Sequence, residues 1–334
     1  MTQRAFITQE FFDEALSEFD GTEVEVEVRS SPEPLPYDEL TARLGEYQGA
    51  ITLLTDRIDE ALLAVNPQLK VVANCAVGFD NIDVDAATRH GVLVTNTPEV
   101  LTDATADLTF SLLLGAARRL PEGDAFLRAG KYRFWRLHQE QIGLDVYGQV
   151  LGIFGLGKIG KAVAKRAKGG FGMTVLYYDA YRLDPEQERE LGVEYVSFEE
   201  LLERSDFVSV HAPLTPETRH AFDADAFARM KDSAVLVNSA RGPIIDEAAL
   251  AQALRSGAIA GAGLDVYEHE PEVHPDLLDI RERVVLLPHL GSGTERTRMR
   301  MARMAAANLR EGVLGRVPQN LVNPDALETG RTQQ

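Results

Sequence analysis

The fold is decided by the stretch Val150-Leu151-Gly152-Ile153-Phe154-Gly155-Leu156-Gly157-Lys158-Ile159-Gly160. Its first five residues predict a buried strand, and the residues from Lys158 onward predict a helix. Between them, three glycines follow a G-x-G-x-x-G spacing. The first permits a tight turn, the second lets the backbone approach a pyrophosphate, and the third allows the helix to pack closely on the strand. The stretch therefore indicates a strand–turn–helix unit that binds a dinucleotide.

A carboxylate follows this unit at the distance that a dinucleotide site needs. Asp179 lies nineteen residues after Gly160, at the end of the next predicted strand, where it can accept a hydrogen bond from a ribose 2′-hydroxyl. The N-terminus of the helix offers free N–H groups and a partial positive charge to the pyrophosphate. Because the charge of Asp179 repels a 2′-phosphate, the sequence favours NAD as the cofactor. Arg182 could offset part of that charge, so NADP stays open as the alternative.

Strands and helices alternate on both sides of the glycine stretch. Short apolar runs predict strands over residues 5–8, 24–28, 50–54, 70–75, 92–95, 150–154, 174–178, 207–211, 235–238, 261–266 and 284–287. Helices are expected over residues 11–19, 59–65, 102–119, 158–168, 247–255 and 294–314, and a frayed tail over 324–334. Such a βαβ series forms a parallel sheet with helices on both faces. The expected fold class is therefore α/β, with two Rossmann-like doubly wound domains.

The composition fits two globular domains and argues against several kinds of function. The chain has 334 residues, of which 45% are hydrophobic, enough to bury two cores. Its 52 acidic and 34 basic residues give a net charge of −18, which disfavours binding to nucleic acid or to a membrane surface. The single cysteine, Cys75, excludes a disulfide framework or a cysteine metal cluster within one chain, and we expect no metal. With no recognisable signal peptide and no apolar run of about 20 residues, we expect a cytoplasmic protein.

Three polar side chains follow strands of the second alternation. Arg241 comes after the strand predicted at 235–238, Glu270 after that at 261–266, and His289 after that at 284–287. In open α/β sheets, ligands bind beyond the carboxyl ends of the strands, so the three side chains can converge on one crevice.

The chemistry of these three groups is complementary. A guanidinium can grip a carboxylate with two parallel hydrogen bonds, and an imidazole can give or take a proton near neutral pH. A carboxylate that is hydrogen-bonded to the imidazole orients it and favours its protonated form. With a nicotinamide supplying hydride, the set is suited to reducing a 2-keto acid to a 2-hydroxy acid. Taken singly, each residue has a plainer interpretation as a surface ion pair, a boundary histidine or a solvated turn.

Several stretches carry a resemblance to a known family. They are Val71–Asp83 (VVANCAVGFDNID), Thr97–Asp107 (TPEVLTDATAD), the glycine stretch, Asn238–Gly242 (NSARG) and Pro288–Ser292 (PHLGS). With these, the chain resembles the D-isomer-specific 2-hydroxyacid dehydrogenases along nearly its whole length. The first two stretches are most similar to glyoxylate and hydroxypyruvate reductases, so the resemblance implies reduction of glyoxylate or hydroxypyruvate to the D-2-hydroxy acid with NADH.

The resemblance implies a role for each candidate catalytic residue. His289 would protonate the substrate oxygen as general acid, Glu270 would partner His289, and Arg241 would bind the substrate carboxylate and polarise the carbonyl. The backbone amides of Val77 and Gly78 would hold the same carboxylate from the other domain.

The resemblance also implies which residues hold the cofactor. Thr105 would lie near the cofactor phosphates or nicotinamide, Asp265 at the nicotinamide carboxamide, and the segment 211–213 beside the adenosine. The full set expected at the cofactor is Thr105, Gly155, Gly157, Lys158, Ile159, Gly160, Asp179, His211, Ala212, Pro213, Ala240, Asp265 and Gly291.

The family's architecture implies a split chain. Residues 1–98 and 291–334 would form the substrate domain, residues 99–290 would form the NAD-binding domain, and the active site would lie in the cleft between them. Such enzymes are usually homodimers, and the segment around Trp135, the only tryptophan, would make a dimer contact or a pocket wall; the alternative is that Trp135 is simple core. His138 could touch substrate, although surface exposure is the plainer expectation.

Three alternatives stay open at this point. The substrate could be another 2-keto acid, such as pyruvate in a D-lactate-type enzyme, because one methylene changes discrimination by only about 1–3 kcal/mol. The chain could instead be an NAD-sensing, corepressor-like scaffold, since fold alone does not decide function. A phosphite dehydrogenase is disfavoured, because Val77 stands where those enzymes carry a lysine.

Overall fold

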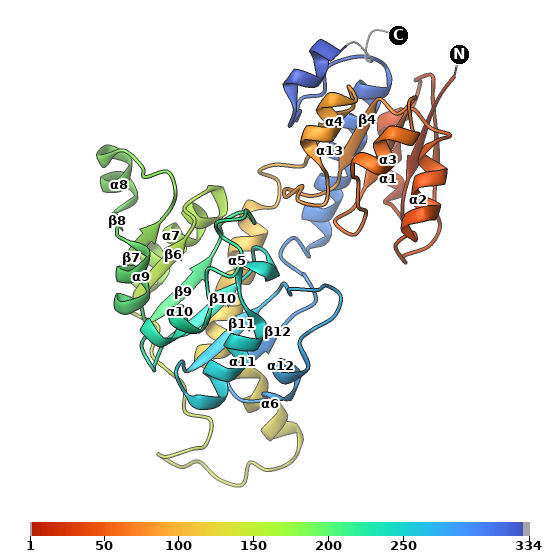
Figure 1. The fold of residues 1–334 in the computed structure, drawn as a ribbon. Coiled ribbons are helices and arrows are strands. Elements are labelled where there is room, and N and C mark those ends of the chain that lie inside the picture. Colours follow the sequence, from red (N-terminus) through yellow and green to blue (C-terminus); the bar gives the residue numbers. More distant parts are fainter. Residues whose placement is uncertain (1, 330–334) are drawn as a thin grey trace. The chain divides into compact units, whose positions relative to one another are not determined.

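The computed structural model describes residues 2–329, and contacts within the chain divide it into two compact units (Figure 1). Unit 1 comprises Met1–Leu101 and Thr294–Gln334, and unit 2 comprises Thr102–Gly293. The predicted domain boundaries, after residue 98 and before residue 291, each lie three residues earlier in the chain than the boundaries between these two units.

Unit 1 is built on a five-stranded parallel sheet with the strand order β2-β1-β3-β4-β5. Its strands are β1 (Gln3–Ile7), β2 (Val24–Val28), β3 (Gly49–Thr52), β4 (Val71–Asn74) and β5 (Leu93–Thr95). β3 and β4 are buried at every position, as expected for central strands covered on both faces. The chain goes from β1 outward to β2 and then returns to β3 on the other side, so the direction of winding switches between β1 and β3.

Helices cover both faces of this sheet. They are α1 (Asp13–Leu16), η1 (Ser17–Phe19), α2 (Tyr37–Leu44), α3 (Glu60–Val65), α4 (Val84–Arg89), α13 (Glu295–Val313) and η3 (Pro324–Thr329). Helices α2, α3 and α4 pack on one face, whereas α13, η1 and η3 pack on the other. The last segment of the chain therefore completes the core of the first.

Unit 2 is built on a seven-stranded parallel sheet with the order β12-β11-β10-β9-β6-β7-β8. Its strands are β6 (Val150–Phe154), β7 (Thr174–Tyr178), β8 (Val193–Tyr195), β9 (Phe207–Val210), β10 (Val235–Asn238), β11 (Gly261–Leu264) and β12 (Val284–Leu286). The winding switches between β6 and β9, and ligands of open α/β sheets bind at such a point, beyond the carboxyl ends of the strands.

The helices of unit 2 are α5 (Thr102–Ala117), α6 (Leu120–Arg128), α7 (Lys158–Phe171), α8 (Pro185–Leu191), α9 (Phe198–Arg204), α10 (Ala224–Arg229), η2 (Gly242–Ile244), α11 (Glu247–Ser256) and α12 (Pro275–Asp279). α9 to α12 pack on one face of the sheet, and α5 and α7 pack on the other, with α5 lying along β10 and β11 (Figure 1). Within residues 2–329, no helix combines the length and the apolar character that a membrane crossing requires.

Most predicted elements are present, with three informative differences. The helix predicted to end at Lys168 runs through Gly169 and Gly170 to Phe171, because Gly172 supplies the left-handed cap at φ 57°. The helix predicted over 11–19 is a single α-turn followed by a 3-10 turn. The frayed tail predicted from Pro324 is wrong as far as Thr329, because these residues form η3 and bury Ala326; residues 330–334 lie outside the described part of the chain.

Candidate active site

The glycine loop lies at the winding switch of the seven-stranded sheet. It leaves β6 with Gly155 at φ 93°, a left-handed conformation that glycine adopts without steric cost. A Cβ at Gly155 would lie 2.4 Å from the backbone nitrogen of Ala212, so this loop packs directly on the turn that follows β9. The predicted residues His211 and Ala212 therefore adjoin the glycine loop, and the exposed Pro213 comes next.

The other two glycines of the loop differ in what surrounds them. A Cβ at Gly160 would lie 2.4 Å from the carbonyl oxygen of Gly155, so this glycine serves the packing of α7 on the loop. A Cβ at Gly157 would meet nothing within 4 Å, which leaves open space in front of the N-terminus of α7, where Lys158 and Ile159 are the first helical residues. This open approach to the N-terminus of the helix fits the pyrophosphate of a dinucleotide.

The carboxylate of Asp179 is held beside the same loop. It follows β7 and accepts hydrogen bonds from the backbone N–H of Leu156 at 2.7 Å and of Tyr181 at 2.9 Å. The predicted acid thus lies beside the glycine loop. The guanidinium of Arg182, in contrast, is held by both carboxylate oxygens of Glu188, at 2.8 and 3.1 Å.

His211 is a neutral side chain in this turn. Its Nε2 and the Oγ of Ser209 are 2.7 Å apart, and burial lowers the pKa of the imidazole to about 3. The ring therefore carries no charge near neutral pH and adds none beside the expected adenosine site.

The structure brings the three candidate catalytic residues together within unit 2. The Nδ1 of His289 lies 2.8 Å from the Oε2 of Glu270, and the Oε1 of Glu270 accepts the N–H of Tyr267 at 3.0 Å. Arg241 lies close enough for its charge to act on Glu270. Both the guanidinium and the imidazole thus surround one carboxylate, as the strand ends predicted.

The pKa of Glu270 is lowered by this arrangement. Burial by itself would raise it, but the hydrogen bond and charge of His289, the N–H of Tyr267 and the charge of Arg241 together outweigh burial. The carboxylate therefore stays ionised and can stabilise a cationic imidazole at His289.

The turn that carries Arg241 is fixed by a residue that the sequence did not single out. The side chain of Asn238 accepts the N–H of Ala240 at 3.0 Å and donates to the carbonyl of Arg241 at 2.8 Å. An asparagine that ends a buried strand is a common turn residue, and that pattern is the one signal that could have identified it.

Three predicted cofactor residues form a second cluster. A Cβ at Gly291 would lie 3.4 Å from both the Oδ2 of Asp265 and the side chain of Thr105. The Oδ1 of Asp265 accepts the N–H of Leu290 at 2.6 Å. The Oδ2 of Asp265 is buried and has no hydrogen-bond partner among residues 2–329. Burial raises the pKa of Asp265, although the N–H of Leu290 and the charge of His289 each act to lower it. A buried acceptor without a partner is costly, and it suits a ligand that brings a donor such as a carboxamide.

The predicted Val77–Gly78 turn lies in unit 1, after β4. Its carbonyls accept side-chain hydrogen bonds, Val77 from Asn96 at 2.8 Å and Gly78 from Asn74 at 2.9 Å. Within the described part of the chain, neither amide N–H of this turn donates a hydrogen bond to a protein acceptor. Two asparagines, which the sequence analysis did not identify, thus hold a turn whose amides can bind an anion.

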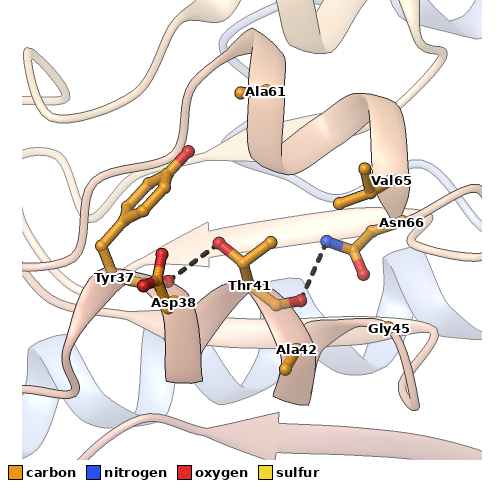
Figure 2. Close-up of a pocket in the computed structure, with 8 residues that line it drawn as sticks. All are labelled: Tyr37, Asp38, Thr41, Ala42, Gly45, Ala61, Val65 and Asn66. Atoms are coloured by element: carbon orange, nitrogen blue, oxygen red, sulfur yellow. Dashed lines mark hydrogen bonds between the residues drawn. The ribbon is translucent and has the colours of Figure 1, made fainter.

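A surface groove of about 430 Å³ also lies in unit 1, between α2 and α3. Figure 2 shows that its polar groups bind one another: Thr41 donates to the carbonyl of Tyr37, and Asn66 donates to the carbonyl of Thr41. The predicted site residues do not line it, so we do not assign the site to this groove.

The structure contradicts one of the two expectations for Trp135, that it is a core residue. Residues 129–149 contain neither helix nor strand, and Trp135 is 69% exposed. The interpretation of Trp135 as simple core is therefore wrong. His138 is also exposed.

Comparison with known proteins identifies the family of this chain. Residues 110–291 match the NAD binding domain of D-isomer specific 2-hydroxyacid dehydrogenases. A glyoxylate reductase from Korarchaeum cryptofilum is 47% identical over 328 residues, covering 98% of each chain. The crystal structure of a glyoxylate reductase from Paecilomyes thermophila is similar with a TM-score of 0.84 at 36% identity, covering 96% of this chain and 98% of that one.

A third relative bears on the cofactor. The structure of an NADPH-dependent glyoxylate/hydroxypyruvate reductase from Sinorhizobium meliloti, in complex with NADP and malonate, is similar with a TM-score of 0.82 at 32% identity and covers 98% of each chain. These comparisons confirm the predicted resemblance and the predicted α/β fold class with two parallel-sheet domains. The chain belongs to the D-isomer specific 2-hydroxyacid dehydrogenases, a family of oxidoreductases, and carries their NAD-binding domain.

Proposed function

We propose that this protein reduces glyoxylate or hydroxypyruvate to the corresponding 2-hydroxy acid, with NADH as the reductant. The observation that carries the proposal is the 2.8 Å contact between His289 and Glu270 beside the charge of Arg241. An acid–base group, its carboxylate partner and a carboxylate-binding cation are the parts that this reduction needs. The curated relative from Korarchaeum cryptofilum, a glyoxylate reductase, supports the choice of a small substrate.

The residues at the winding switch fit NAD. Gly157 leaves the N-terminus of α7 open for the pyrophosphate, and the unpartnered Oδ2 of Asp265 offers an acceptor for the carboxamide. Asp179 would accept a ribose hydroxyl and repel a 2′-phosphate. Because Arg182 is paired with Glu188, it is not placed to neutralise that repulsion. These contacts favour NAD over NADP for this chain.

We assign the substrate carboxylate to Arg241 and to the amides of Val77 and Gly78. A guanidinium recognises a planar carboxylate with two hydrogen bonds, and the two amides offer further N–H donors. A second contact from the guanidinium to the keto oxygen would polarise the carbonyl and stabilise the negative charge that develops there.

Proton transfer falls to His289. Its Nδ1 is occupied by Glu270, so Nε2 is the ring nitrogen that can donate to the keto oxygen. NADH, when bound, supplies hydride to the keto carbon. As the C–H bond forms, the carbonyl π bond breaks and the oxygen takes the proton from Nε2. The imidazole is left neutral, and a proton from solvent restores it.

The experiment is a panel of keto acids assayed with NADH and NADPH. Glyoxylate and hydroxypyruvate should give higher kcat/KM than pyruvate or bulky keto acids, and NADH should be preferred. A faster rate with pyruvate would instead identify a D-lactate-type enzyme. NADH binding without turnover of any keto acid would identify a nucleotide-sensing scaffold.

We further propose that the protein is a homodimer in the cytoplasm. Of the fifteen large apolar side chains that are exposed in residues 2–329, eight lie between residues 120 and 147. They are Leu120, Leu127, Tyr132, Phe134, Trp135, Leu137, Ile142 and Tyr147. Large exposed apolar patches mark interaction surfaces, and we propose that these side chains form one, with a second copy of the chain as the partner. NADH, the proposed reductant, is present in the cytoplasm.

A further inference from the structure

Glu247 is a buried acid close to the site that has no role so far. It is the first residue of α11 and is 3% exposed. The preceding residue, Asp246, already caps that helix by accepting the N–H of Ala249 at 2.9 Å. The carboxylate of Glu247 is therefore not needed as the N-cap. A buried carboxylate is retained at little cost only when hydrogen bonds satisfy it, so its partners indicate its purpose.

The two oxygens of Glu247 bind the backbone on either side of Glu270. Oε1 accepts the N–H of Glu268 at 2.8 Å, and Oε2 accepts the N–H of His274 at 3.2 Å. Between these points the chain turns back on itself, with the N–H of Glu272 donating to the carbonyl of His269 at 2.9 Å. One side chain thus fixes both ends of the short segment that presents the candidate catalytic carboxylate.

The same segment is also packed against the turn of Arg241. A Cβ at Gly242 would lie 1.8 Å from the carbonyl carbon of Tyr267, so the two backbones are in direct contact. Gly242 and Glu247 belong to one continuous stretch, residues 241–247. A shift of residues 267–268 would therefore disturb the guanidinium of Arg241 as well as the carboxylate of Glu270.

Other charged groups surround this clamp. Glu268 pairs through its side chain with His220 at 2.6 Å, and His274 caps α12. Both act electrostatically on Glu247. His220 and Glu268 attach the outer side of the segment, whereas Glu247 holds it from within the core.

We infer that Glu247 is a positioning residue for the reaction: it clamps residues 268–274 so that Glu270 meets His289 and residues 267–268 support Arg241. This inference rests on the proposed function. In Glu247→Gln the shape is kept, but one of the two acceptors becomes an NH2 group that faces a backbone N–H. The segment should then loosen while the fold persists.

The test combines hydrogen exchange with steady-state kinetics. In Glu247→Gln, peptides spanning residues 266–276 should exchange faster than in the wild type, while those from β6 and α7 should not change. We expect kcat to fall about 10-fold, a part of what the acid–base pair contributes. KM for the keto acid should rise, because Arg241 is proposed to bind its carboxylate, whereas the affinity for NADH should stay close to wild type. Glu247→Asp keeps both oxygens on a shorter stem, so its exchange rate and kcat should lie between those of the wild type and of Glu247→Gln. It replaces Glu247→Gln in the test if that variant does not fold.

Asp206→Asn is the matched control. Asp206 also accepts a backbone N–H, that of Val150 at 2.9 Å, and pairs with Lys231, but it lies at the amino end of the sheet. It should alter stability without changing kcat. Unchanged exchange of residues 266–276, or faster exchange with unchanged kcat, would overturn the inference. If the wild type turns over no keto acid, the proposed function fails, and the exchange data alone then decide whether Glu247 holds the segment.

Discussion

At the scale of single residues, His289 and Arg241 divide the proposed chemistry between a proton donor and an anion-binding group. Each acts on charge that develops during the reaction, so His289→Ala and Arg241→Ala should each lower turnover at least about 100-fold. Neither residue is predicted to bind the nucleotide, so NADH titrations should remain as in the wild type. Normal turnover in both variants would remove the role assignments, whatever the substrate proves to be.

We expect the choice of cofactor to depend on Asp179. Its carboxylate is fixed by the N–H groups of Leu156 and Tyr181 and would repel a 2′-phosphate. Asp179→Ser should therefore raise the ratio of kcat/KM with NADPH to that with NADH by at least about tenfold, which corresponds to about 1.4 kcal/mol. Adding Glu188→Gln, which frees Arg182 from its ion pair, should raise the ratio further. A ratio that does not move in either variant would show that other contacts choose the cofactor.

The lowered pKa of Glu270 makes a prediction about stability and pH. A carboxylate with a depressed pKa stabilises the fold above its unfolded value, and that contribution is lost as the pH falls through the folded pKa. The Tm difference between the wild type and Glu270→Gln should thus stay constant on acidification until the pH is below 4.5, the ordinary value for this group, and should then shrink. Scanning calorimetry at about pH 3 to 6 measures it. A difference that grows on acidification would contradict this assignment.

At the scale of elements, we expect two glycines of the β6–loop–α7 unit to have separate roles, Gly160 in folding and Gly157 in nucleotide binding. Gly160→Ala would place a Cβ 2.4 Å from the carbonyl oxygen of Gly155, so it should lower Tm by about 2–4 °C for each kcal/mol of strain. Gly157 has φ −69° and open space around its Cβ position, so Gly157→Ala should leave Tm near wild type and weaken NADH binding about tenfold or more. Calorimetry and a fluorescence titration on both variants check this. The reverse pattern would mean that Gly157 serves packing.

The elements also show what sequence patterns can and cannot supply. The buried strands were predictable because parallel strands covered on both faces are continuous apolar runs, and the glycine spacing located the loop at the winding switch. Helix α2 was missed because it directly follows a Pro-rich stretch that ends at Pro36, and such a stretch is typical of a loop. The extension of α7 through Gly169 was missed because a Gly-Gly pair predicts an end, whereas the cap is Gly172.

Within the candidate site, the predictable part was the convergence of the groups that we propose to do the chemistry. Arg241, Glu270 and His289 follow strand ends, and parallel strands bring their carboxyl ends to one edge. The residues that hold these groups in place were not predictable. Glu247 looks in the sequence like any acid in the first turn of a helix, and its two backbone partners lie more than twenty residues away along the chain. Such contacts depend on tertiary packing, which local patterns do not report.

At the scale of the whole molecule, the exposed apolar side chains of residues 120–147 determine the expected assembly. Helix α6 buries none of its residues, and a stable interface needs about 800 Å² from each partner, which a set of large aromatic and aliphatic side chains can supply. The wild type should therefore sediment at twice the monomer mass of 36.7 kDa. The triple variant Phe134→Ser, Trp135→Ser, Leu137→Ser should sediment as a monomer, because it removes apolar area from the centre of that segment.

A matched triple variant tests whether position or mere apolar exposure matters. Tyr181, Leu278 and Val317 are 86%, 53% and 59% exposed and lie outside the segment, so replacing all three with serine should leave the dimer intact. None of the six side chains is buried in the chain's own core. At a concentration low enough for both the variant and the wild type to be monomeric, each variant should therefore unfold near the wild-type temperature. A wild type that is monomeric at about 100 μM, well above the Kd of a stable dimer, would refute the assembly, and so would a dimer that survives the first variant and dissociates in the second.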